Sequence, residues 1–535
     1  MKDMNKIDVL FVGAGPASLA GAIALKRRLN AEKLSASVVV IEKADKLGQH
    51  NLSGAVFEAS VLDELVPGWQ DSKEAFITRM LANKIEKDET YFLTHSGSIR
   101  IAESLMPKAM HHKGDYAISI SELVNWLAGI ARGLGVEIYT GFSAIDILRE
   151  NNTVKGIKLG EKGLDKAHKP LCNYLPQENI EAKVTVFGEG SLGQLSEKLI
   201  DTLKLALNRN IQIHSLGVKE IIRLPEKNNF GTNRVIHTLG FPNRPEIFGG
   251  GTLYNMNETT VAVALVLALD WKYCDLNPQQ ELQVFKSHRL ISHLLEGGEV
   301  IAYGARTLPE GGYYSVPGVS TNGALIIGDA AGFTNAQKLK GLHYAMKSGM
   351  LAAEAIFKAV ESGSYTTLDL KRYDELLKDS FIIRDLFHAR NYRQVFNTTF
   401  GLYLGVPLSF VQHMKPRLRT EHDYKSMRKK KLNRHYKGGT DRLTDISLSG
   451  TIHRENEPSH ITFKDPGQCH SCAEKVGCNP CEFFCPGEVY RFENNEMILS
   501  PSNCLHCQTC RVKCPQQNII WNVPEGGDGP KYKVM

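Results

Sequence analysis

The chain has 535 residues, which is room for two to four domains, and 42% of them are hydrophobic, as in an ordinary globular protein. The net charge of +6 is small for this length and identifies no partner, and the sequence lacks the run of about 18 apolar residues that a bilayer-spanning helix needs. Nine of the eleven cysteines lie between Cys469 and Cys514. Since the rest of the chain is almost free of cysteine, this crowding favours a metal-binding tail on a protein of a reducing compartment over a disulfide framework.

The first predicted element is a buried strand at residues 7–13, and a glycine-rich turn, GAGPAS, follows it. A helical stretch comes next, and a second strand, VVVIE, ends at Glu42. This order is the fingerprint of dinucleotide-binding folds. Gly13 permits the tight turn, and Gly15 lets the backbone approach a pyrophosphate at the helix N-terminus. Ser18 replaces the third glycine with another small residue, and Glu42 falls where a ribose-binding carboxylate belongs.

A second glycine motif, GALIIGDAAG, occupies residues 323–332. It resembles the second flavin motif of glutathione-reductase-like FAD enzymes, in which an aspartate after a strand binds the ribityl chain. Gly328 and Asp329 take those positions here, and the alternative is an aspartate that caps an ordinary helix. Two separated segments of one FAD site imply that the residues between them form an inserted domain. No second fingerprint for a nicotinamide cofactor follows, so NAD(P)H is not expected to be the direct reductant.

Two segments in the middle of the chain have more than one interpretation. The apolar stretch TVAVALVLALDW, residues 260–271, fits a buried core strand or helix, and also one-sided contact with a membrane. The segment from Lys415 to Lys437 holds ten Lys and Arg against two acids. It fits a solvated linker or a surface that docks on an acidic redox partner or anionic lipid. Nucleic-acid binding is disfavoured because no aromatic residues are interleaved with the charges.

The cysteine-rich tail contains the bacterial ferredoxin run, with its cysteines separated by two, two and three residues before a proline. A second run supplies the remaining thiolate. The crossed pattern therefore predicts one [4Fe–4S] cluster, and a zinc ribbon is the rival interpretation. The predicted ligands are Cys485, Cys504, Cys507 and Cys510.

The same crossed pattern predicts a second cluster that includes Cys514. The run that ends at Cys485 is irregular, because Lys475 stands where its leading cysteine belongs. Three of Cys469, Cys472, Cys478 and Cys481 would complete the set, and our prediction uses Cys472, Cys478 and Cys481. Zinc or free thiols are the alternatives.

Together, these motifs resemble the electron-transfer flavoprotein:ubiquinone oxidoreductase family. Further segments look like those of the family and occur in its order: LSGAVFE, FGGGTLYNMNE, LEGGEVIAYGART, KLKGLHYAMKSGMLAAE and VPEGGDGPKY. The resemblance implies an α/β fold, α+β overall: a glutathione-reductase-like FAD-binding Rossmann-type domain, an inserted quinone-binding domain and a C-terminal ferredoxin-like iron–sulfur domain. The expected boundaries are 1–95, 116–205 and 311–365 for the FAD domain, 96–115 and 206–310 for quinone-binding segments, 366–440 for a helical and basic connection, and 441–535 for the cluster domain.

The resemblance also implies roles for single residues. Gly249 and Gly250 would lie at the quinone carbonyl, although a plain glycine-rich turn is the alternative. Tyr490 and Thr509 stand where family hydroxyls hydrogen-bond the cluster, and Ser53 and Asn335 look like polar contacts of the flavin. Phe248 departs from the tyrosine that is common in the family, so a quinone contact through that hydroxyl is absent.

The function implied by the resemblance is electron transfer from reduced electron-transfer flavoprotein, through a 4Fe–4S cluster and FAD, to ubiquinone or menaquinone. The alternatives are a quinone-reducing component of an electron-bifurcating flavoprotein complex and a geranylgeranyl-reductase-like flavoprotein. A strand that begins at Ile7 leaves no room for a signal peptide or presequence. We therefore expect peripheral attachment to the cytoplasmic face of a prokaryotic inner membrane, through apolar surface near residues 106–112 and 248–271.

Overall fold

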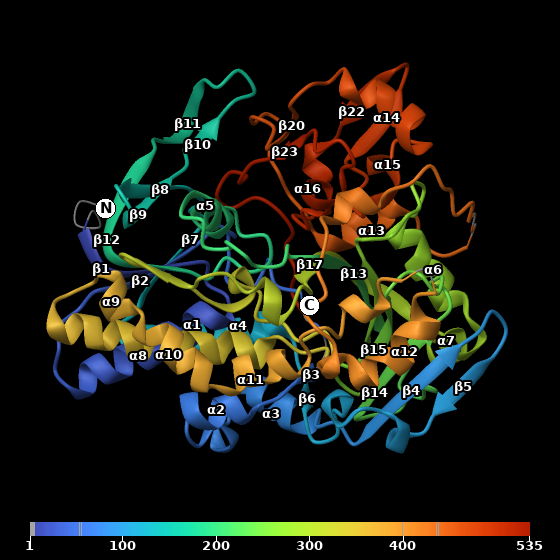
Figure 1. Ribbon diagram of the computed structural model, residues 1–535, viewed down its shortest axis with the longest axis horizontal. Coiled ribbons are helices and arrows are strands. Elements are labelled where there is room, and N and C mark those ends of the chain that lie inside the picture. Colours follow the sequence, from blue (N-terminus) through green and yellow to red (C-terminus); the bar gives the residue numbers. More distant parts are fainter. Residues whose placement is uncertain (1–5, 53, 55, 399, 435, 437) are drawn as a thin grey trace.

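The computed structural model describes residues 6–535 apart from 53, 55, 399, 435 and 437, so the predicted flavin contact Ser53 lies outside the described residues. The described chain folds around two large sheets, with a smaller cysteine-rich part packed beside the second (Figure 1). Each sheet has its own hydrophobic core.

In the described residues the first sheet has eight strands, and its parallel centre has the order β19, β12, β1, β2, β7. The strands are β1 (Lys6–Val12), β2 (Val38–Glu42), β7 (Glu137–Thr140), β8 (Ala144–Glu150), β9 (Thr153–Leu159), β12 (Glu178–Phe187), β18 (Ser320–Thr321) and β19 (Ala324–Ile326). This parallel order brings the ends of β1, β2, β12 and β19 to one edge, where a doubly wound sheet binds its ligand. The two predicted motifs follow β1 and β19 and therefore meet.

Helices cover this sheet, and the long helix α8 packs along α1 (Figure 1). The helices of this part are α1 (Pro16–Ala31), α2 (Ser60–Leu65), α3 (Ala75–Ala82), α4 (Ile120–Gly133), α5 (Gln194–Thr202), α8 (Leu342–Ser362), α9 (Thr367–Leu370), α10 (Arg372–Asp379) and α11 (Phe381–His388). The buried faces of α1 and α8 are rich in alanine and glycine. Small side chains let the two helices approach closely, which holds both glycine motifs in a fixed relation.

Seven described strands form the second sheet, in the order β17, β13, β16, β15, β14, β4, β5. They are β4 (Lys87–Leu93), β5 (Ser98–Ile101), β13 (His214–Arg223), β14 (Arg234–Gly240), β15 (Gly249–Asn255), β16 (Thr260–Ala268) and β17 (Glu299–Pro309), with α6 (Pro278–Ser287) and α7 (Arg289–Leu294) packed on them. The sheet takes in β4 through its parallel pairing with β14, so it begins at Lys87, earlier than the expected break at residue 96.

The apolar stretch at residues 260–271 is the central strand β16 and the turn after it. Val261, Val263 and Leu265 are fully buried between β13 and β15. The core interpretation is confirmed for this stretch. The expectation that it contacts a membrane is wrong, because both its neighbours in the sheet and its packing partners come from the protein itself.

The cysteine-rich part consists of short elements. They are α13 (Arg442–Ser449), β20 (Ile461–Phe463), α14 (Gln468–Val476), α15 (Cys481–Phe484), β21 (Tyr490–Glu493), β22 (Glu496–Leu499), α16 (Thr509–Lys513) and β23 (Ile519–Trp521). The remaining short strands are β3 (Val56–Phe57), β6 (Tyr116–Ala117), β10 (Lys162–Leu164) and β11 (Pro170–Leu175), and α12 (Leu402–Val411) precedes the basic segment.

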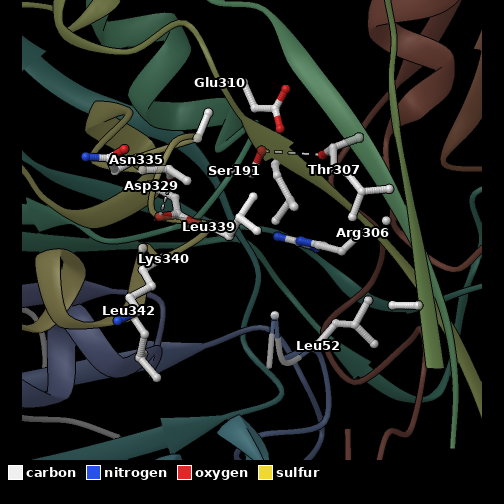
Figure 2. Close-up of a pocket in the computed structure, with 18 of the residues that line it drawn as sticks. Leu52, Ser191, Arg306, Thr307, Glu310, Asp329, Asn335, Leu339, Lys340 and Leu342 are labelled. Carbon is white, nitrogen blue, oxygen red and sulfur yellow. Dashed lines mark hydrogen bonds between the residues drawn. The ribbon is translucent and has the colours of Figure 1, made fainter. Parts of the chain in front are cut away.

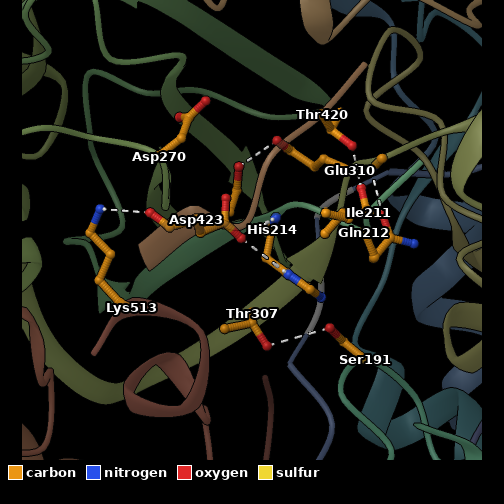
Figure 3. Close-up of polar contacts among 12 residues, drawn as sticks. Ser191, Ile211, Gln212, His214, Asp270, Thr307, Glu310, Thr420, Asp423 and Lys513 are labelled. Carbon is orange, nitrogen blue, oxygen red and sulfur yellow. Dashed lines mark hydrogen bonds and ion pairs between the residues drawn. The ribbon is translucent and has the colours of Figure 1, made fainter. Parts of the chain in front are cut away.

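The basic segment braces the cysteine-rich part against the second sheet (Figure 3). Asp423 accepts a hydrogen bond from the backbone N–H of His214 at 3.0 Å, and the buried Lys513 ammonium donates to the Trp271 carbonyl at 2.6 Å. Arg417 donates to Asn210 at 2.9 Å. Asp423 thus anchors the segment to the second sheet, but every described Lys and Arg in it except Arg434 is exposed, so a solvated linker and a docking surface both stay predictions.

Candidate functional site

A cavity of about 930 Å³ lies between the two sheets and is lined by all three parts of the fold. Figure 2 shows side chains from several segments directed into it, among them Arg306 and Asp329. The first sheet contributes its glycine turns, the second contributes β14 to β16, and the cysteine-rich part contributes Gln508 and Trp521. A cavity shared in this way can place a long cofactor and a second ligand in contact.

The predicted pyrophosphate end is the turn between β1 and α1. Gly13 has a φ of +92°, and a Cβ there would stand 2.7 Å from the Gly188 carbonyl oxygen, so glycine is required by the fold itself. A Cβ on Gly15 would meet no atom within 4 Å, and Gly15 lines the cavity. The open space at Gly15 and the N-terminus of α1 fit a phosphate group.

Glu42 lines the cavity at the end of β2, where its carboxylate is held by two backbone N–H groups. Ala14 donates to one oxygen at 2.9 Å and Ala44 to the other at 2.8 Å. The remaining lone pairs fit the hydroxyls of a ribose. Ser18 does not line the cavity: it is fully buried with its oxygen beside Gly188. The prediction of Ser18 as a cofactor contact is therefore corrected to a small packing residue.

Asp329 lies in the turn after β19 and faces the cavity beside Gly328 (Figure 2). Thr334 Oγ1 donates to Asp329 Oδ1 at 3.1 Å. Burial raises the pKa of Asp329, while this hydrogen bond and the nearby Arg306 charge lower it. Because α8 begins only at Leu342, the carboxylate does not cap that helix. A buried carboxylate aimed into the cavity fits the ribityl hydroxyls of FAD.

Asn335 also lines the cavity, but its amide serves the neighbouring loop. Its Oδ1 accepts hydrogen bonds from the N–H groups of Gln337 at 3.0 Å and Lys338 at 3.1 Å. Its Nδ2 donates to the Asp385 carbonyl at 3.4 Å. The contribution of Asn335 is therefore to shape the wall that carries Leu339 and Lys340.

The sequence analysis missed the loop after β12, which reads GEGSLG over residues 188–193 and lines the cavity. Glu189 in this loop accepts hydrogen bonds from the N–H groups of Leu195 at 3.1 Å and Ser196 at 2.7 Å, and so caps α5. Burial raises the pKa of Glu189. A third strand followed by a glycine-rich loop was the available signal.

At the far end of the cavity, Gly249 and Gly250 lie on β15. A Cβ on Gly249 would stand 2.0 Å from the Val266 carbonyl oxygen, and one on Gly250 would stand 2.1 Å from the Thr238 carbonyl oxygen. The sheet itself therefore requires both glycines. Both also line the cavity, and their contact with a quinone carbonyl stays a prediction, because substituting them would disturb the sheet first.

This far end contains a few polar groups among apolar ones. Lys219 Nζ donates to the Tyr254 hydroxyl at 2.8 Å, and burial lowers the pKa of Lys219 to about 7. The His237 ring lies 4.8 Å from that of His112, centre to centre. Within the described residues, His237 Nε2 and the Thr252 hydroxyl are buried without a hydrogen-bond partner, and both residues line the cavity. They fit the carbonyl and hydroxyl groups of a polar ring.

The four predicted ligands of the first cluster lie together. Burial, with a smaller contribution from the neighbouring thiols, raises the pKa of Cys485 and that of Cys504 to about 12. Burial also raises the pKa values of Cys507 and Cys510. Thiolates gathered in such a place need the positive charge of a metal centre.

Hydrogen-bond donors surround these sulfurs. The Tyr490 hydroxyl faces Cys510, the Thr509 hydroxyl faces Cys507, and the Trp521 indole N–H faces Cys504. In the described part of the chain, all three donors are buried without an oxygen or nitrogen partner. A sulfur-ligated cluster would give each of them an acceptor, so the residues present fit a [4Fe–4S] cluster.

The second predicted set needs one correction. Cys478 pairs with Cys274, which lies 204 residues earlier in the chain, and does not line the cavity that Cys472, Cys481 and Cys514 share. Cys469 lies beside Cys472 and Cys514 in its place. The prediction that included Cys478 failed because the pairing depends on a distant residue.

Comparison with known proteins gives this arrangement a family. A model of the 4Fe–4S domain of electron transfer flavoprotein-ubiquinone oxidoreductase matches residues 437–533, and a model of the ubiquinone-binding domain of that protein matches residues 214–308. The mitochondrial electron transfer flavoprotein-ubiquinone oxidoreductase of Arabidopsis thaliana is 39% identical, over 100% of this chain and 85% of its own. The chain belongs to this family.

Other members are similar over the same span. The human mitochondrial enzyme of this family is 35% identical over 99% of this chain and 89% of its own. Among solved structures, a geranylgeranyl bacteriochlorophyll reductase-like protein from Thermoplasma acidophilum has a TM-score of 0.58, with 19% identity, 77% coverage of this chain and 93% of that one. This last likeness shows the flavoprotein fold alone.

The family confirms the expected fold class, with flavin, quinone-binding and 4Fe–4S parts in one chain. FAD and a 4Fe–4S cluster are the cofactors, and the chain is an oxidoreductase. The cavity and the four thiols described above are the places in the chain that fit them.

Proposed function

We propose that this chain carries electrons from reduced electron-transfer flavoprotein to ubiquinone or menaquinone, by way of the 4Fe–4S cluster and FAD. The names of the relatives described above include electron transfer flavoprotein and ubiquinone. The observation that carries the proposal is the single cavity, whose wall includes the dinucleotide turn, the cluster loop and the quinone-domain sheet. FAD, when bound, supplies the exchange between one-electron and two-electron transfer.

The residues that join the cofactor sites support this route. Gln508 lines the cavity and follows the cluster ligand Cys507 directly in the chain. Trp521 lines the cavity and faces Cys504. These two residues connect the four thiols to the cavity wall, so they would hold the two cofactors close enough for direct electron transfer.

The far end of the cavity fits a quinone. Apolar side chains from β15, β16, residues 101–110 and α12 line it, and the Lys219–Tyr254 pair lies at its inner part. Quinone reduction takes up two protons with two electrons. Because burial lowers the pKa of Lys219 to about 7, its ammonium can release a proton from Nζ near neutral pH, and we propose that it supplies one of them.

The proposal includes attachment to one membrane leaflet. None of the described helices is both long and apolar enough to cross a bilayer. Around α12, apolar side chains are exposed: Phe400 62%, Tyr403 64%, Phe410 54%, and Met414 75%. Several residues of α12 also line the cavity, so this surface would surround the entrance for an isoprenoid chain. Leu105, 67% exposed, extends it to the expected segment at residues 106–112.

We propose that the protein lies on the cytoplasmic face of the inner membrane of a prokaryotic cell. The relatives described above are mitochondrial, so the compartment is a separate part of the proposal. Fractionation of the native cell, with the protein recovered in inner-membrane vesicles and accessible to protease only from the cytoplasmic side, is the expected result. Accessibility to protease only from the opposite side of the vesicles would contradict this part alone, whereas recovery in the soluble fraction would contradict membrane attachment itself.

The roles of Tyr490 and Thr509 are also part of the proposal. Each hydroxyl would donate a hydrogen bond to a cluster sulfur and so raise the reduction potential of the cluster. Both donors are buried beside their thiols, which is the arrangement this role requires.

The quinone step is tested with a variant that fills the cavity without disturbing the glycines. Val266 on β16 lines the cavity and lies opposite Gly250 in the neighbouring strand. In Val266→Phe, anaerobic mixing with reduced electron-transfer flavoprotein should bleach the protein at the wild-type rate, and short-chain ubiquinone should fail to re-oxidise it. Leu368→Phe, at a site 81% exposed on α9, is the control. Re-oxidation of Val266→Phe at the wild-type rate would place the quinone elsewhere.

A further inference from the structure

A second set of four thiols lies in the cysteine-rich part, separate from the ligands of the first cluster. Cys469 and Cys472 lie three residues apart on one side of α14, Cys481 begins α15, and Cys514 follows α16. All four thiols line the same small cavity, of about 20 Å³, so they converge on one place. We propose that these four cysteines hold a second [4Fe–4S] cluster.

The spacing of the sulfurs favours a cluster over a single ion. Four thiolates around one zinc lie about 3.8 Å apart, given a Zn–S bond of about 2.3 Å and tetrahedral angles. Among the described residues, the only His, Cys, Asp or Glu ligand atoms gathered in a group of three or more within 4.8 Å of one another belong to His453, His460 and His506. The second thiol set is therefore wider than a zinc site. The first set, for which we predict a 4Fe–4S cluster, likewise has no three sulfurs within 4.8 Å of one another among the described residues.

Hydrogen bonds to sulfur repeat between the two sets. The backbone N–H of Val489 donates to Cys485 Sγ at 3.5 Å, and the backbone N–H of Asn518 donates to Cys514 Sγ at 3.4 Å. In both cases the donor comes four residues after a cysteine that precedes proline, and directly before a short strand. The two halves of this part are thus built alike around the two sets.

The side chain of Asn518 adds a further contact, because its Nδ2 donates to Cys469 Sγ at 3.5 Å. One asparagine therefore donates hydrogen bonds to sulfurs from two different elements, α14 and the end of α16. Phe463, Phe484, Met497 and Ile519 close the small cavity. Donors to sulfur inside an apolar wall are the surroundings that iron–sulfur clusters have in proteins.

The ligand set differs from the spacing rule of the sequence in one member. The regular run would use Cys478, but in the structure Cys478 pairs with Cys274. Cys469, on α14, takes its place in the set. A helical turn places Cys469 and Cys472 on the same face. The site is therefore complete without Cys478.

A cluster here would take up one electron and pass on the same electron, with no proton or bond change. It would lie beside the first cluster, since Cys510 lies within α16 and Cys514 directly follows that helix. The assignment of the site does not depend on the direction of electron flow or on the identity of the quinone, so it stands or falls separately from the proposed function.

The full-length wild-type protein, purified without oxygen, gives the direct test. Iron, acid-labile sulfide and zinc are measured against FAD. The proposal predicts about eight iron and about eight sulfide per chain without zinc. About four iron per chain, with or without one zinc, would overturn it. This count needs no variant and is therefore independent of folding defects.

Three substitutions identify the ligands. Cys472→Ser should lose about half of the iron while keeping FAD and the EPR signal of the first cluster. Cys478→Ser, the neighbouring control, should keep all of the iron. Asn518→Ala should shift the midpoint potential of one of two EPR signals to lower values and leave the other unchanged. Loss of iron in Cys478→Ser with full iron in Cys472→Ser, or equal shifts of all signals in Asn518→Ala, would contradict the assignment.

Discussion

Arg306 Nη1 donates a hydrogen bond to the backbone carbonyl oxygen of His506 at 3.2 Å. Arg306 lines the flavin cavity, and His506 lies in the loop between the cluster ligands Cys504 and Cys507. Burial raises the pKa of both Asp329 and Cys507, and the Arg306 charge opposes that rise at each of them. One guanidinium thus fixes the cluster loop to the cavity and favours negative charge on both sides.

Removing this charge should make both centres harder to reduce. In Arg306→Met, each added electron loses a Coulomb stabilisation of about 1–2 kcal/mol at an effective dielectric constant of about 20. That is about 60 mV for one electron. Arg306→Lys, which keeps the charge, should show a smaller shift. Spectroelectrochemical titration of the FAD and of the cluster measures both, with Arg223→Met, an exposed arginine paired with Glu299, as the control. Unchanged potentials in Arg306→Met would refute the role.

Flavin binding should be abolished by one substitution that the protein itself tolerates. Gly15→Val adds a side chain where no protein atom lies within 4 Å, so only the space of the pyrophosphate is filled. We expect folded protein without FAD, seen as loss of the flavin absorbance with unchanged circular dichroism. Gly13→Ala, in contrast, should destabilise the fold because its Cβ meets the Gly188 carbonyl. Stoichiometric FAD in Gly15→Val would show that the cofactor lies elsewhere.

Membrane binding should depend on the surface around α12. Burying one large apolar side chain contributes about 1.5–3 kcal/mol. Placing aspartates at Tyr403 and Phe410 should therefore weaken sedimentation with anionic liposomes by at least about 100-fold. The wild type should be released by detergent and only partly by salt. Leu368→Asp, on α9 at the opposite side of Figure 1, should bind as the wild type does. Equal binding by the double variant would rule out this surface.

Stability should fall as the pH decreases from 7.5 to 5.5, in part because of His343. Burial, with Lys338 and Lys340 nearby, lowers the pKa of His343 to about 3. In the unfolded chain its pKa is about 6.5, so the unfolded state binds the extra proton first and acid favours unfolding. This histidine contributes about 1.4 kcal/mol of the loss over that range. Urea unfolding of His343→Gln should show a correspondingly weaker pH dependence than the wild type; parallel curves would contradict the shift.

The sequence predicted the parts of the site that depend on local spacing. Gly15, Glu42 and Asp329 line one cavity, and the first four thiols lie together, while the cofactor contacts of all these residues stay predictions. Such motifs carry their own geometry, because a strand, a turn and a helix or a run of cysteines is set by neighbouring residues.

The parts that could not be predicted depend on distant residues. The choice of Cys469 over Cys478 rests on Cys274, far away in the chain. The apolar sequence of β16 fits a core strand as well as membrane contact until its neighbouring strands are known. The exposure of apolar residues on α12 likewise depends on surroundings that the sequence does not give. Periodicity alone cannot separate a buried apolar face from an exposed one.

The most direct test of the account is anaerobic mixing of wild-type protein, loaded with FAD and iron, with reduced electron-transfer flavoprotein and a short-chain quinone. Quinol is measured against the electrons supplied, with ubiquinone and menaquinone analogues in parallel. The account predicts one quinol for each two electrons with at least one of the two quinones, and none in Gly15→Val. Fully loaded protein that reduced electron-transfer flavoprotein does not bleach, or bleached protein that leaves both quinones oxidised, would contradict it.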